Sequence, residues 1–312
     1  MKARKVVVTG GAGFIGSNLV RYLSNDNRVV VIDDLSTGHI KNIKDLIDDK
    51  KIDFIEGSVT DLPFLQKIFK NVHYVFHEAA IPSVPRSIKD PITTSNVSIN
   101  GTLNVLIAAR DFGIEKVIYA SSSSVYGDTP TLPKTEEMTP NPLSPYAVAK
   151  LAGEYYCHVF NEVFHLPTVI LRYFNVYGPR QDPASEYAAV IPKFITRILN
   201  DTPPLVYGDG NQTRDFTFVG DVINANILAA ESDATGIFNA AGGKRISLNE
   251  LAKTIMVLCN KNLEIRYEAV RLGDIKHSLA DISKAKEKFD YSPKFDIKNG
   301  LKETIQWFQK QS

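Results

Sequence analysis

Short apolar runs alternate with longer amphipathic segments along the first half of this 312-residue chain. The runs are rich in Val and Ile, as in strands that a sheet buries on both faces. Strands that alternate with helical segments are typical of a parallel sheet with crossover helices. The expected strands are Val6–Val8, Val29–Ile32, Ile52–Ile55, Val72–Phe76, Val117–Tyr119 and Thr168–Leu171, and the expected helices are Ile15–Leu23, Asp61–Phe69, Thr93–Asp111 and Pro145–Phe164.

The expected helix Thr93–Asp111 has apolar residues spread along its length. One of its faces would pack on the sheet, and another could be spared for a partner subunit. Its apolar positions include Val97, Leu103, Val105, Leu106 and Ile107.

Beyond Gly178 the alternation weakens, and prolines and glycines become frequent. We interpret this part as a smaller, irregular lobe. The segment 216–230 and an expected strand, Gly236–Asn239, return to the sheet in this interpretation. The sequence thus predicts one large unit over residues 1–180, rejoined by 216–240, and a lobe formed by 181–215 and 241–312.

The composition is that of an ordinary globular protein, with 44% hydrophobic and 23% charged residues. Basic and acidic side chains number 36 and 35, so the formal net charge of +1 gives no electrostatic footprint for a nucleic acid or an anionic membrane. No apolar stretch approaches the roughly 18 residues of a membrane span. The run Val6–Val8 after the basic start is too short for a secretion signal. We therefore expect a cytoplasmic protein.

The two cysteines, Cys157 and Cys259, are far apart in the chain. Neither has a second cysteine or a histidine cluster at metal-binding spacing nearby, so we expect no metal site. Both are interpreted as small core residues in a reducing compartment.

A glycine-rich turn stands directly between the first expected strand and the first expected helix. Glycines at 10, 11, 13 and 16 permit a tight turn, a close approach to a pyrophosphate and packing of the helix on the strand. The helix that follows offers unpaired N–H groups to an anion. The glycines alone would also fit a turn without a ligand.

Asp33 favours the dinucleotide interpretation. It stands at the end of the second expected strand, about 20 residues beyond the glycine turn, where a carboxylate accepts hydrogen bonds from ribose hydroxyls. A carboxylate there repels a 2′-phosphate, so NAD is favoured over NADP. An ordinary cap or turn acid is the alternative, and the neighbouring Asp34 could take that role. Loop and carboxylate together predict an NAD-binding Rossmann-type fold.

Tyr146 and Lys150 are four positions apart on an expected helix that begins with Ser144 and Pro145. An ammonium close to a phenol favours the phenolate, so we expect Lys150 to lower the pKa of Tyr146. The positive nicotinamide ring would add to this effect. Tyr146 could then act as a base near neutral pH. A surface Tyr/Lys pair is the alternative on spacing alone.

Four serines, Ser121 to Ser124, follow the strand Val117–Tyr119. The carboxyl end of a central strand is where an open α/β sheet presents groups to a ligand. A hydroxyl there can donate to a substrate oxygen and relay its proton. For Ser121 and Ser123 taken individually, a polar loop is the favoured interpretation.

In these motifs the chain resembles the extended short-chain dehydrogenase/reductase family and, more narrowly, the UDP-sugar 4-epimerases. The resemblance covers essentially the whole chain. It implies an α/β fold with a Rossmann-type doubly wound parallel sheet and a smaller C-terminal substrate-binding lobe, NAD as cofactor and a UDP-sugar as substrate. Its motifs are Thr9–Asn18, Phe76–Ala80, Ser121–Gly127, Tyr146 with Lys150, Leu171–Pro179 and Gly208–Phe216.

The resemblance implies that Tyr146 is the catalytic base, that Lys150 binds the nicotinamide ribose, and that Ser122 supplies the catalytic hydroxyl. One departure occurs at Ser58, where relatives usually carry Asp to meet the adenine amine, so this contact is weakened. The implied cofactor contacts are Gly10, Gly13, Phe14, Ile15, Gly16, Asp33, Asp34, Ser36, Thr37, Gly38, Ser58, Val59, Ala79, Ala80, Tyr146, Lys150 and, beside the nicotinamide, Tyr173.

The implied substrate contacts divide between nucleotide and sugar. Arg214, Arg271 and Asp274 match positions for the diphosphate and the uridine ribose, where the planar fork of arginine suits phosphate. The other implied contacts are Ser83, Arg86, Ser122, Ser124, Tyr146, Asn175, Ala189, Val190, Tyr207 and Ser278.

Ser278 falls where the family places a residue beside the sugar C2 substituent. A large aromatic there confines such enzymes to glucose and galactose, and a small residue leaves room for an N-acetyl group. Ser278 thus resembles the branch that interconverts UDP-GlcNAc and UDP-GalNAc, while preference for UDP-Glc and UDP-Gal stays open. The implied mechanism oxidises the sugar at C4, rotates the 4-keto sugar and returns the hydride to the opposite face, with NAD retained throughout.

Three other functions use parts of the same pattern. A 4,6-dehydratase would need acidic residues among the middle serines, and Ser121–Ser124 contain none. A UDP-uronate epimerase or decarboxylase would need a base near the sugar carboxylate, and Arg86 keeps this alternative open. A non-catalytic NAD-sensing module is disfavoured by the intact Ser122, Tyr146 and Lys150. The resemblance also implies a homodimer through the helices that begin near Thr93 and Pro145.

Overall fold

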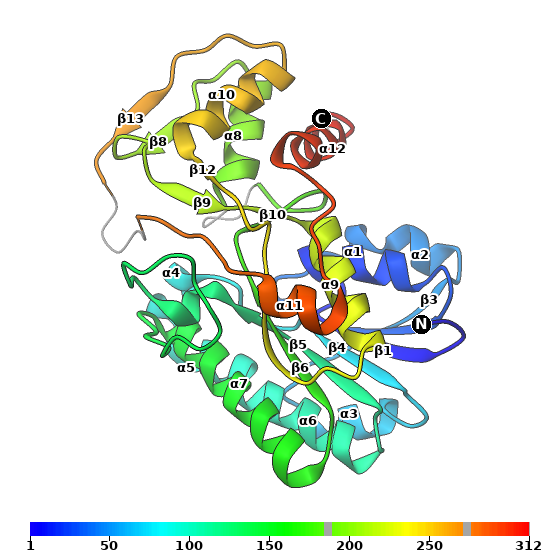
Figure 1. Ribbon diagram of the computed structural model, residues 1–312. Coiled ribbons are helices and arrows are strands. Elements are labelled where there is room, and N and C mark those ends of the chain that lie inside the picture. Colours follow the sequence, from blue (N-terminus) through cyan, green and yellow to red (C-terminus); the bar gives the residue numbers. More distant parts are fainter. Residues whose placement is uncertain (184–188, 271–275, 312) are drawn as a thin grey trace.

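The fold centres on a seven-stranded parallel sheet, which the computed structural model, describing residues 1–183, 189–270 and 276–311, shows in full (Figure 1). The strand order is β11-β6-β5-β4-β1-β2-β3. This order confirms the predicted doubly wound architecture. The strands are β1 (Lys5–Thr9), β2 (Arg28–Asp33), β3 (Ile52–Glu56), β4 (Tyr74–His77), β5 (Lys116–Ser122), β6 (Thr168–Tyr173) and β11 (Gly236–Ala240).

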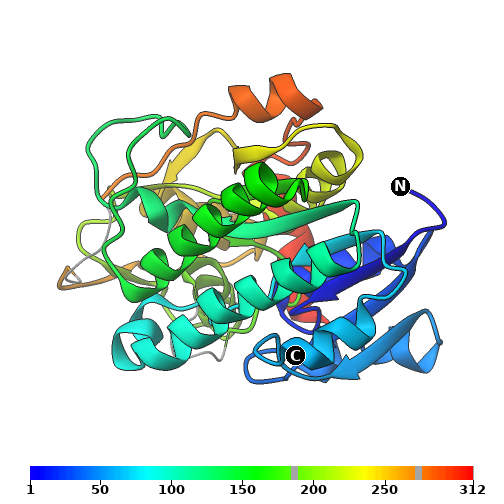
Figure 2. The ribbon, with the colours of Figure 1, turned by 90° about the horizontal axis from the view of Figure 1, so that it is seen from below.

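Alternate residues of each strand enter two separate cores, one on each face of the sheet. Val6 and Val8 of β1 pack in one core and Val7 in the other, because successive side chains of a strand point to opposite faces. The first core is closed by α1 (Phe14–Leu23) and α9 (Val219–Glu231), and the second by α3 (Leu62–Ile68), α6 (Gly101–Asp111) and α7 (Pro145–Phe164). Figure 2 shows α6 and α7 side by side across the second face.

The predicted helix Thr93–Asp111 is present as one continuous helical stretch, but it begins earlier than predicted. It begins with α5 (Pro91–Ser95), passes through a π-helical turn at Asn96–Asn100 and ends as α6. The earlier start has a local cause, because the Asp90 carboxylate accepts from the Thr93 N–H at 3.0 Å and caps the helix. A short helix, α4 (Val84–Lys89), precedes it.

The C-terminal lobe is the part of the chain at the top of Figure 1, away from the large sheet. It contains short strand pairs and several helices, in line with the weak alternation of the sequence there. The division into two domains stays a prediction. The pairs are β8 (Leu205–Tyr207) with β13 (Arg266–Glu268) and β9 (Thr213–Asp215) with β12 (Arg245–Ser247), and the helices are α8 (Val190–Leu199), α10 (Leu248–Leu258) and α12 (Ile297–Gln309).

The remaining elements connect these parts. The chain returns from the lobe to the large sheet with α9, which packs on β5 and β6, and with β11, which pairs with β6 at the sheet edge. Within the described ranges, no helix is both long and apolar enough to cross a membrane. The connecting elements are a 3-10 turn (Ile40–Asn42), α2 (Lys44–Asp48), a second 3-10 turn (Ser123–Tyr126), β7 (Val176–Tyr177) paired with β10 (Thr217–Phe218), and α11 (Ser283–Phe289).

Candidate active site

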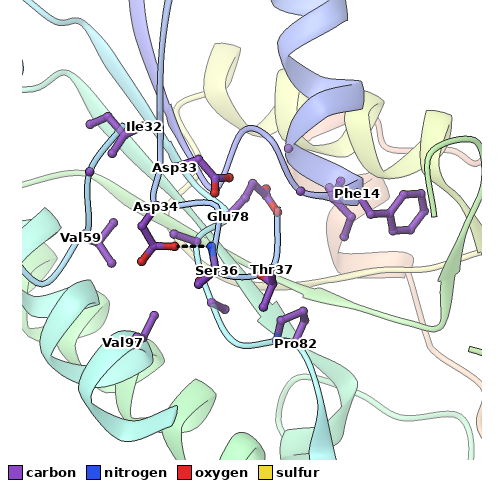
Figure 3. Close-up of a pocket in the computed structure, with 17 residues that line it drawn as sticks. Phe14, Ile32, Asp33, Asp34, Ser36, Thr37, Val59, Glu78, Pro82 and Val97 are labelled. Atoms are coloured by element: carbon purple, nitrogen blue, oxygen red, sulfur yellow. Dashed lines mark hydrogen bonds between the residues drawn. The ribbon is translucent and has the colours of Figure 1, made fainter. Parts of the chain in front are cut away.

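A cavity opens at the carboxyl ends of β1, β2 and β4, where the glycine turn leads into α1 (Figure 3). Ligands of open α/β sheets bind at this edge, because the loops after adjacent parallel strands meet there. The predicted cofactor residues that line the cavity are Gly10, Gly13, Phe14, Ile15, Gly16, Asp33, Asp34, Ser36, Thr37, Val59, Ala79 and Ala80.

The glycine turn is too tightly packed for side chains. Gly10 has a left-handed φ of +70°, and a Cβ there would lie 2.7 Å from the Ala79 backbone. A Cβ on Gly16 would collide with the carbonyl oxygen of Gly10. Only glycine permits this approach, which leaves the N-terminus of α1 open to an anion.

Asp33 is held in place by backbone donors. Its two carboxylate oxygens accept from the N–H groups of Ala12 and Leu35, each at 2.9 Å. Burial raises the pKa of Asp33, and these two hydrogen bonds oppose that rise. Gly38 packs directly against the carboxylate. A fixed acidic acceptor beside an open glycine turn fits the ribose and pyrophosphate of a dinucleotide.

Several predicted cofactor residues lie outside the cavity lining. The Ser58 hydroxyl accepts from the Thr60 hydroxyl at 3.1 Å. Tyr173 is buried and lies at the end of β6, and its neighbour Phe174 lines a different, smaller cavity. The cofactor roles of Ser58 and Tyr173 stay predictions.

Tyr146 and Lys150 both belong to α7, which packs against β5 and β6. The Ser122 hydroxyl at the end of β5 forms a hydrogen bond with the Tyr146 phenol. The Lys150 Nζ donates to the Ala120 carbonyl at 2.6 Å, and burial lowers the pKa of Lys150 to about 8. Serine, phenol and ammonium are therefore brought to one edge of the sheet by two adjacent elements.

In the described residues the pKa of Tyr146 is raised, so the lowering expected from Lys150 is not seen there. Burial raises the pKa of the Tyr146 phenol, the hydrogen bond with Ser122 opposes this rise, and the nearby Glu78 charge adds to it. The spacing rule placed the two side chains on one face of the helix. Spacing alone could not show that the phenol is buried. It also could not show that the Lys150 ammonium donates to the Ala120 carbonyl.

Glu78 is a polar site residue that the sequence did not predict. It follows β4 and lines the cofactor cavity (Figure 3). Its carboxylate accepts from the Tyr173 hydroxyl at 2.8 Å. The Asn226 amide of α9 donates to the same hydroxyl at 2.8 Å. Burial raises the pKa of Glu78 to about 7. Its place directly after a buried strand was the available signal.

A second and larger cavity, of about 580 Å³, lies between α8 and the small strands of the lobe. Arg214 brings a guanidinium to it, and Gln212 steadies Tyr207 by donating to its carbonyl at 2.6 Å. Arg271 and Asp274 fall outside the described residues. The predicted substrate residues that line this cavity are Asn175, Ala189, Val190, Tyr207 and Arg214.

A third, small cavity of about 50 Å³ adjoins the second through Asn175 and Arg214, which line both. Ser278 lines it, and its hydroxyl accepts from the Asn175 amide and the Asp215 N–H, each at 3.2 Å. The Asp215 carboxylate in turn accepts from the backbone N–H groups of Gly242, Gly243 and Ala280. Ser278 is thus fixed by a buried network at the wall of this cavity.

Besides Ser122 and Tyr146, three other predicted substrate residues do not line these cavities: Ser83, Arg86 and Ser124. The Ser124 Oγ is buried and has no hydrogen-bond partner among the described residues. Ser83 caps α4 by accepting from the Arg86 N–H at 3.1 Å. The Ser87 hydroxyl of α4 accepts from the Tyr146 N–H at 3.1 Å, which holds α4 against the start of α7. The substrate roles of Ser83, Arg86 and Ser124 stay predictions.

Comparison with known proteins adds to this geometry. The model of the NAD dependent epimerase/dehydratase family matches residues 6–241. A putative UDP-glucose 4-epimerase of Methanocaldococcus jannaschii is 39% identical over 97% of this chain and 98% of its own length. The UDP-N-acetylglucosamine 4-epimerase from Methanobrevibacter ruminantium M1, solved with UDP-N-acetylmuramic acid, is 45% identical, with a TM-score of 0.97 and 100% of both chains covered. The UDP-glucuronic acid 4-epimerase from Bacillus cereus, solved with UDP-glucuronic acid and NAD, is 34% identical, with a TM-score of 0.91 over 99% of this chain and 100% of that one.

We expect Gly16→Ala to remove bound NAD, because its Cβ would force the turn open at the Gly10 carbonyl. The measurement is NAD content per purified chain. Gly113→Asn is the matched control, since Gly113 has open space around its Cβ position and a φ of +62° that asparagine tolerates. NAD content equal to that of the unmodified protein in Gly16→Ala would contradict the assignment.

We expect Glu78→Gln to let Tyr146 ionise at lower pH. Glu78 is ionised above its pKa of about 7, and its charge then opposes formation of the phenolate. An NMR titration of labelled tyrosine, with the signal assigned by Tyr146→Phe, measures the change. Glu136→Gln is the control, because that carboxylate accepts from the Asn239 N–H instead. An unchanged or higher pKa of Tyr146 in Glu78→Gln would refute the coupling.

Proposed function

Because the chain belongs to the NAD-dependent epimerase/dehydratase family, whose cofactor is NAD, we propose that it is a UDP-hexose 4-epimerase. Its substrates are UDP-GlcNAc and UDP-GalNAc, and it also accepts UDP-Glc and UDP-Gal. The observation that carries the sugar assignment is the small Ser278 side chain at the wall of the third cavity.

The two lobe cavities suit the two halves of such a substrate. The larger one offers the Tyr207 ring and the Arg214 guanidinium, which fit a base and a diphosphate. The smaller one continues from it past Asn175 towards Ser278. The Ser278 hydroxyl is the size of a methyl group and is held by hydrogen bonds from the Asn175 amide and the Asp215 N–H. Space beside it therefore stays available to a sugar substituent.

The described residues supply the proton chemistry. When bound, NAD supplies the acceptor and later the donor of the hydride at sugar C4. Tyr146 takes the proton of the C4 hydroxyl, and Ser122, hydrogen bonded to the phenol, orients that oxygen. Lys150 would hold the ribose of the bound cofactor. Because burial raises the pKa of the Tyr146 phenol, its ionisation at neutral pH requires a nearby positive charge.

UDP-uronates are the second candidate substrates. Arg86 lies on α4, which the Ser87–Tyr146 hydrogen bond of 3.1 Å holds against the catalytic helix. A guanidinium on that helix would suit a sugar carboxylate. The similarity to the UDP-glucuronic acid 4-epimerase from Bacillus cereus agrees with this alternative.

We also propose a homodimer in which α7 packs against the same helix of a second copy. Tyr155, Val159 and Val163 recur every four residues along α7 and are 60%, 43% and 62% exposed, so they form one apolar stripe. Ile88 of α4 and Ile92 of α5 are also exposed, at 64% and 80%. Apolar stripes on neighbouring helices suit a self-complementary helical interface.

The substrate assignment predicts conversion of UDP-GlcNAc to UDP-GalNAc by the purified protein, with UDP-Glc and UDP-glucuronic acid as parallel incubations. Ser278→Tyr should lose at least about 10-fold in kcat/KM for the acetylated sugar, because one aromatic ring fills the added volume, while UDP-Glc turnover is retained. Conversion of UDP-Glc alone by the unmodified protein would contradict the role of Ser278. Conversion of UDP-glucuronic acid alone would favour the uronate candidate.

Tyr146→Phe is the companion test. It should keep bound NAD and the folded state but turn over none of the three sugars. Full turnover would remove Tyr146 from the proposed chemistry. A chain that binds NAD but converts no UDP-sugar in any form would instead be the NAD-sensing module.

Sedimentation measures the proposed assembly. The unmodified protein should sediment as a dimer, and Val159→Glu with Val163→Glu should sediment as a monomer, because two buried charges would oppose the interface. Lys298→Glu, an exposed change on α12, is the control and should remain a dimer. A monomer at working concentration for the unmodified protein would refute the proposal.

A further inference from the structure

A buried ion pair joins the catalytic helix to the sheet. Arg172 of β6 donates from Nε to Glu154 Oε1 at 2.9 Å and from Nη2 to Oε2 at 2.6 Å. Both side chains are 1% exposed. The planar guanidinium therefore holds both oxygens of the carboxylate of α7 and fixes their relative orientation.

Two further groups complete the cluster. The Ser121 hydroxyl of β5 donates to the same Glu154 carboxylate. The Arg172 guanidinium lies over the Tyr126 ring, 4.6 Å from its centroid. The Tyr126 hydroxyl donates to Asn239 Oδ1 of β11 at 2.7 Å. One arginine and one glutamate thus link α7, β5, β6, β11 and the turn Ser123–Tyr126.

Two members of this cluster lie close in the chain to residues proposed for the reaction. Ser121 precedes Ser122 in the chain, and Glu154 lies one helical turn beyond Lys150 on α7. The serine and the helix that carries Tyr146 come from different elements, which the Ser121–Glu154 bond joins directly. A shift of the carboxylate would move both.

Stability alone does not account for the cluster. Taking two charges out of water is costly, and apolar residues of similar volume often replace a buried ion pair without loss of stability. The burial of both charges therefore indicates a role besides stability.

We propose that Glu154 and Arg172 are positioning residues, which hold the Ser122 hydroxyl at the distance from Tyr146 that proton transfer requires. This inference rests on the proposed function. Neither residue contacts the reacting atoms, so both act through Ser121 and α7. Proton transfer depends steeply on the alignment of donor and acceptor, and a displacement of about 1 Å can cost about 100-fold in rate.

The main test replaces the cluster by apolar side chains in the combined variant Ser121→Ala, Glu154→Leu, Arg172→Met. No charge or donor of the cluster is left unpaired, so the fold should be kept. We expect an unchanged thermal unfolding midpoint within a few degrees, unchanged NAD content, an unchanged KM and a kcat lower by about 100-fold. Reduction of the bound cofactor by UDP-GlcNAc, followed by absorbance in a single turnover, should slow by the same factor.

A second variant covers the case in which the first does not fold. Arg172→Lys keeps the charge but cannot hold both carboxylate oxygens in one plane. It should keep NAD and KM and lower kcat at every pH. The control is Arg28→Gln with Asp53→Asn, which removes an exposed ion pair, 71% and 52% exposed, and should change none of these quantities.

The outcomes separate the positioning role from the proposed function. Full kcat in a folded, NAD-loaded combined variant, or in Arg172→Lys, overturns the positioning role while the epimerase assignment stands. An unmodified protein that converts no UDP-sugar overturns the proposed function itself. A raised KM with unchanged kcat would show that the cluster shapes the substrate site, which also contradicts the proposal.

Discussion

Parallel pairing of β1, β4, β5 and β6 is the constraint on which the site depends. Parallel strands end at one edge, so loops far apart in the sequence must meet there. The glycine turn follows β1, Glu78 follows β4, Ser122 ends β5, and Tyr173 ends β6. Helix α7 packs across β5 and β6 and brings Tyr146 and Lys150 to the same edge. Asn175 and Arg214 line both of the other cavities, and Ser278 lines the smaller of the two.

Burial shifts the pKa values of the groups at that edge. It lowers the pKa of Lys150 to about 8, raises that of Glu78 to about 7 and raises that of Tyr146. Each shift favours the neutral form. A small change of charge in the site can therefore decide which of these groups carries a proton. This suits a reaction in which a proton is removed from the substrate and later returned.

The sequence predicted the sheet and the cofactor loop well, because their signals are local. Runs such as Val6–Val8 reveal a buried strand, and glycines at fixed spacing reveal a turn with no room for a Cβ. It failed where the answer depends on packing between distant segments. The Arg172–Glu154 pair joins β6 to α7. The raised pKa of Tyr146 results from burial. The role of Glu78 follows from its contact with Tyr173. The spacing of residues along the chain does not reveal any of these three features.

The most direct test of the account follows one hydrogen atom. UDP-GlcNAc carrying deuterium at sugar C4 is incubated with the purified protein in ordinary water, without added NAD. A retained cofactor that takes up the hydride and returns it predicts UDP-GalNAc with the deuterium still at C4. Loss of the deuterium to solvent, or a need for added NAD in stoichiometric amounts, would contradict the account.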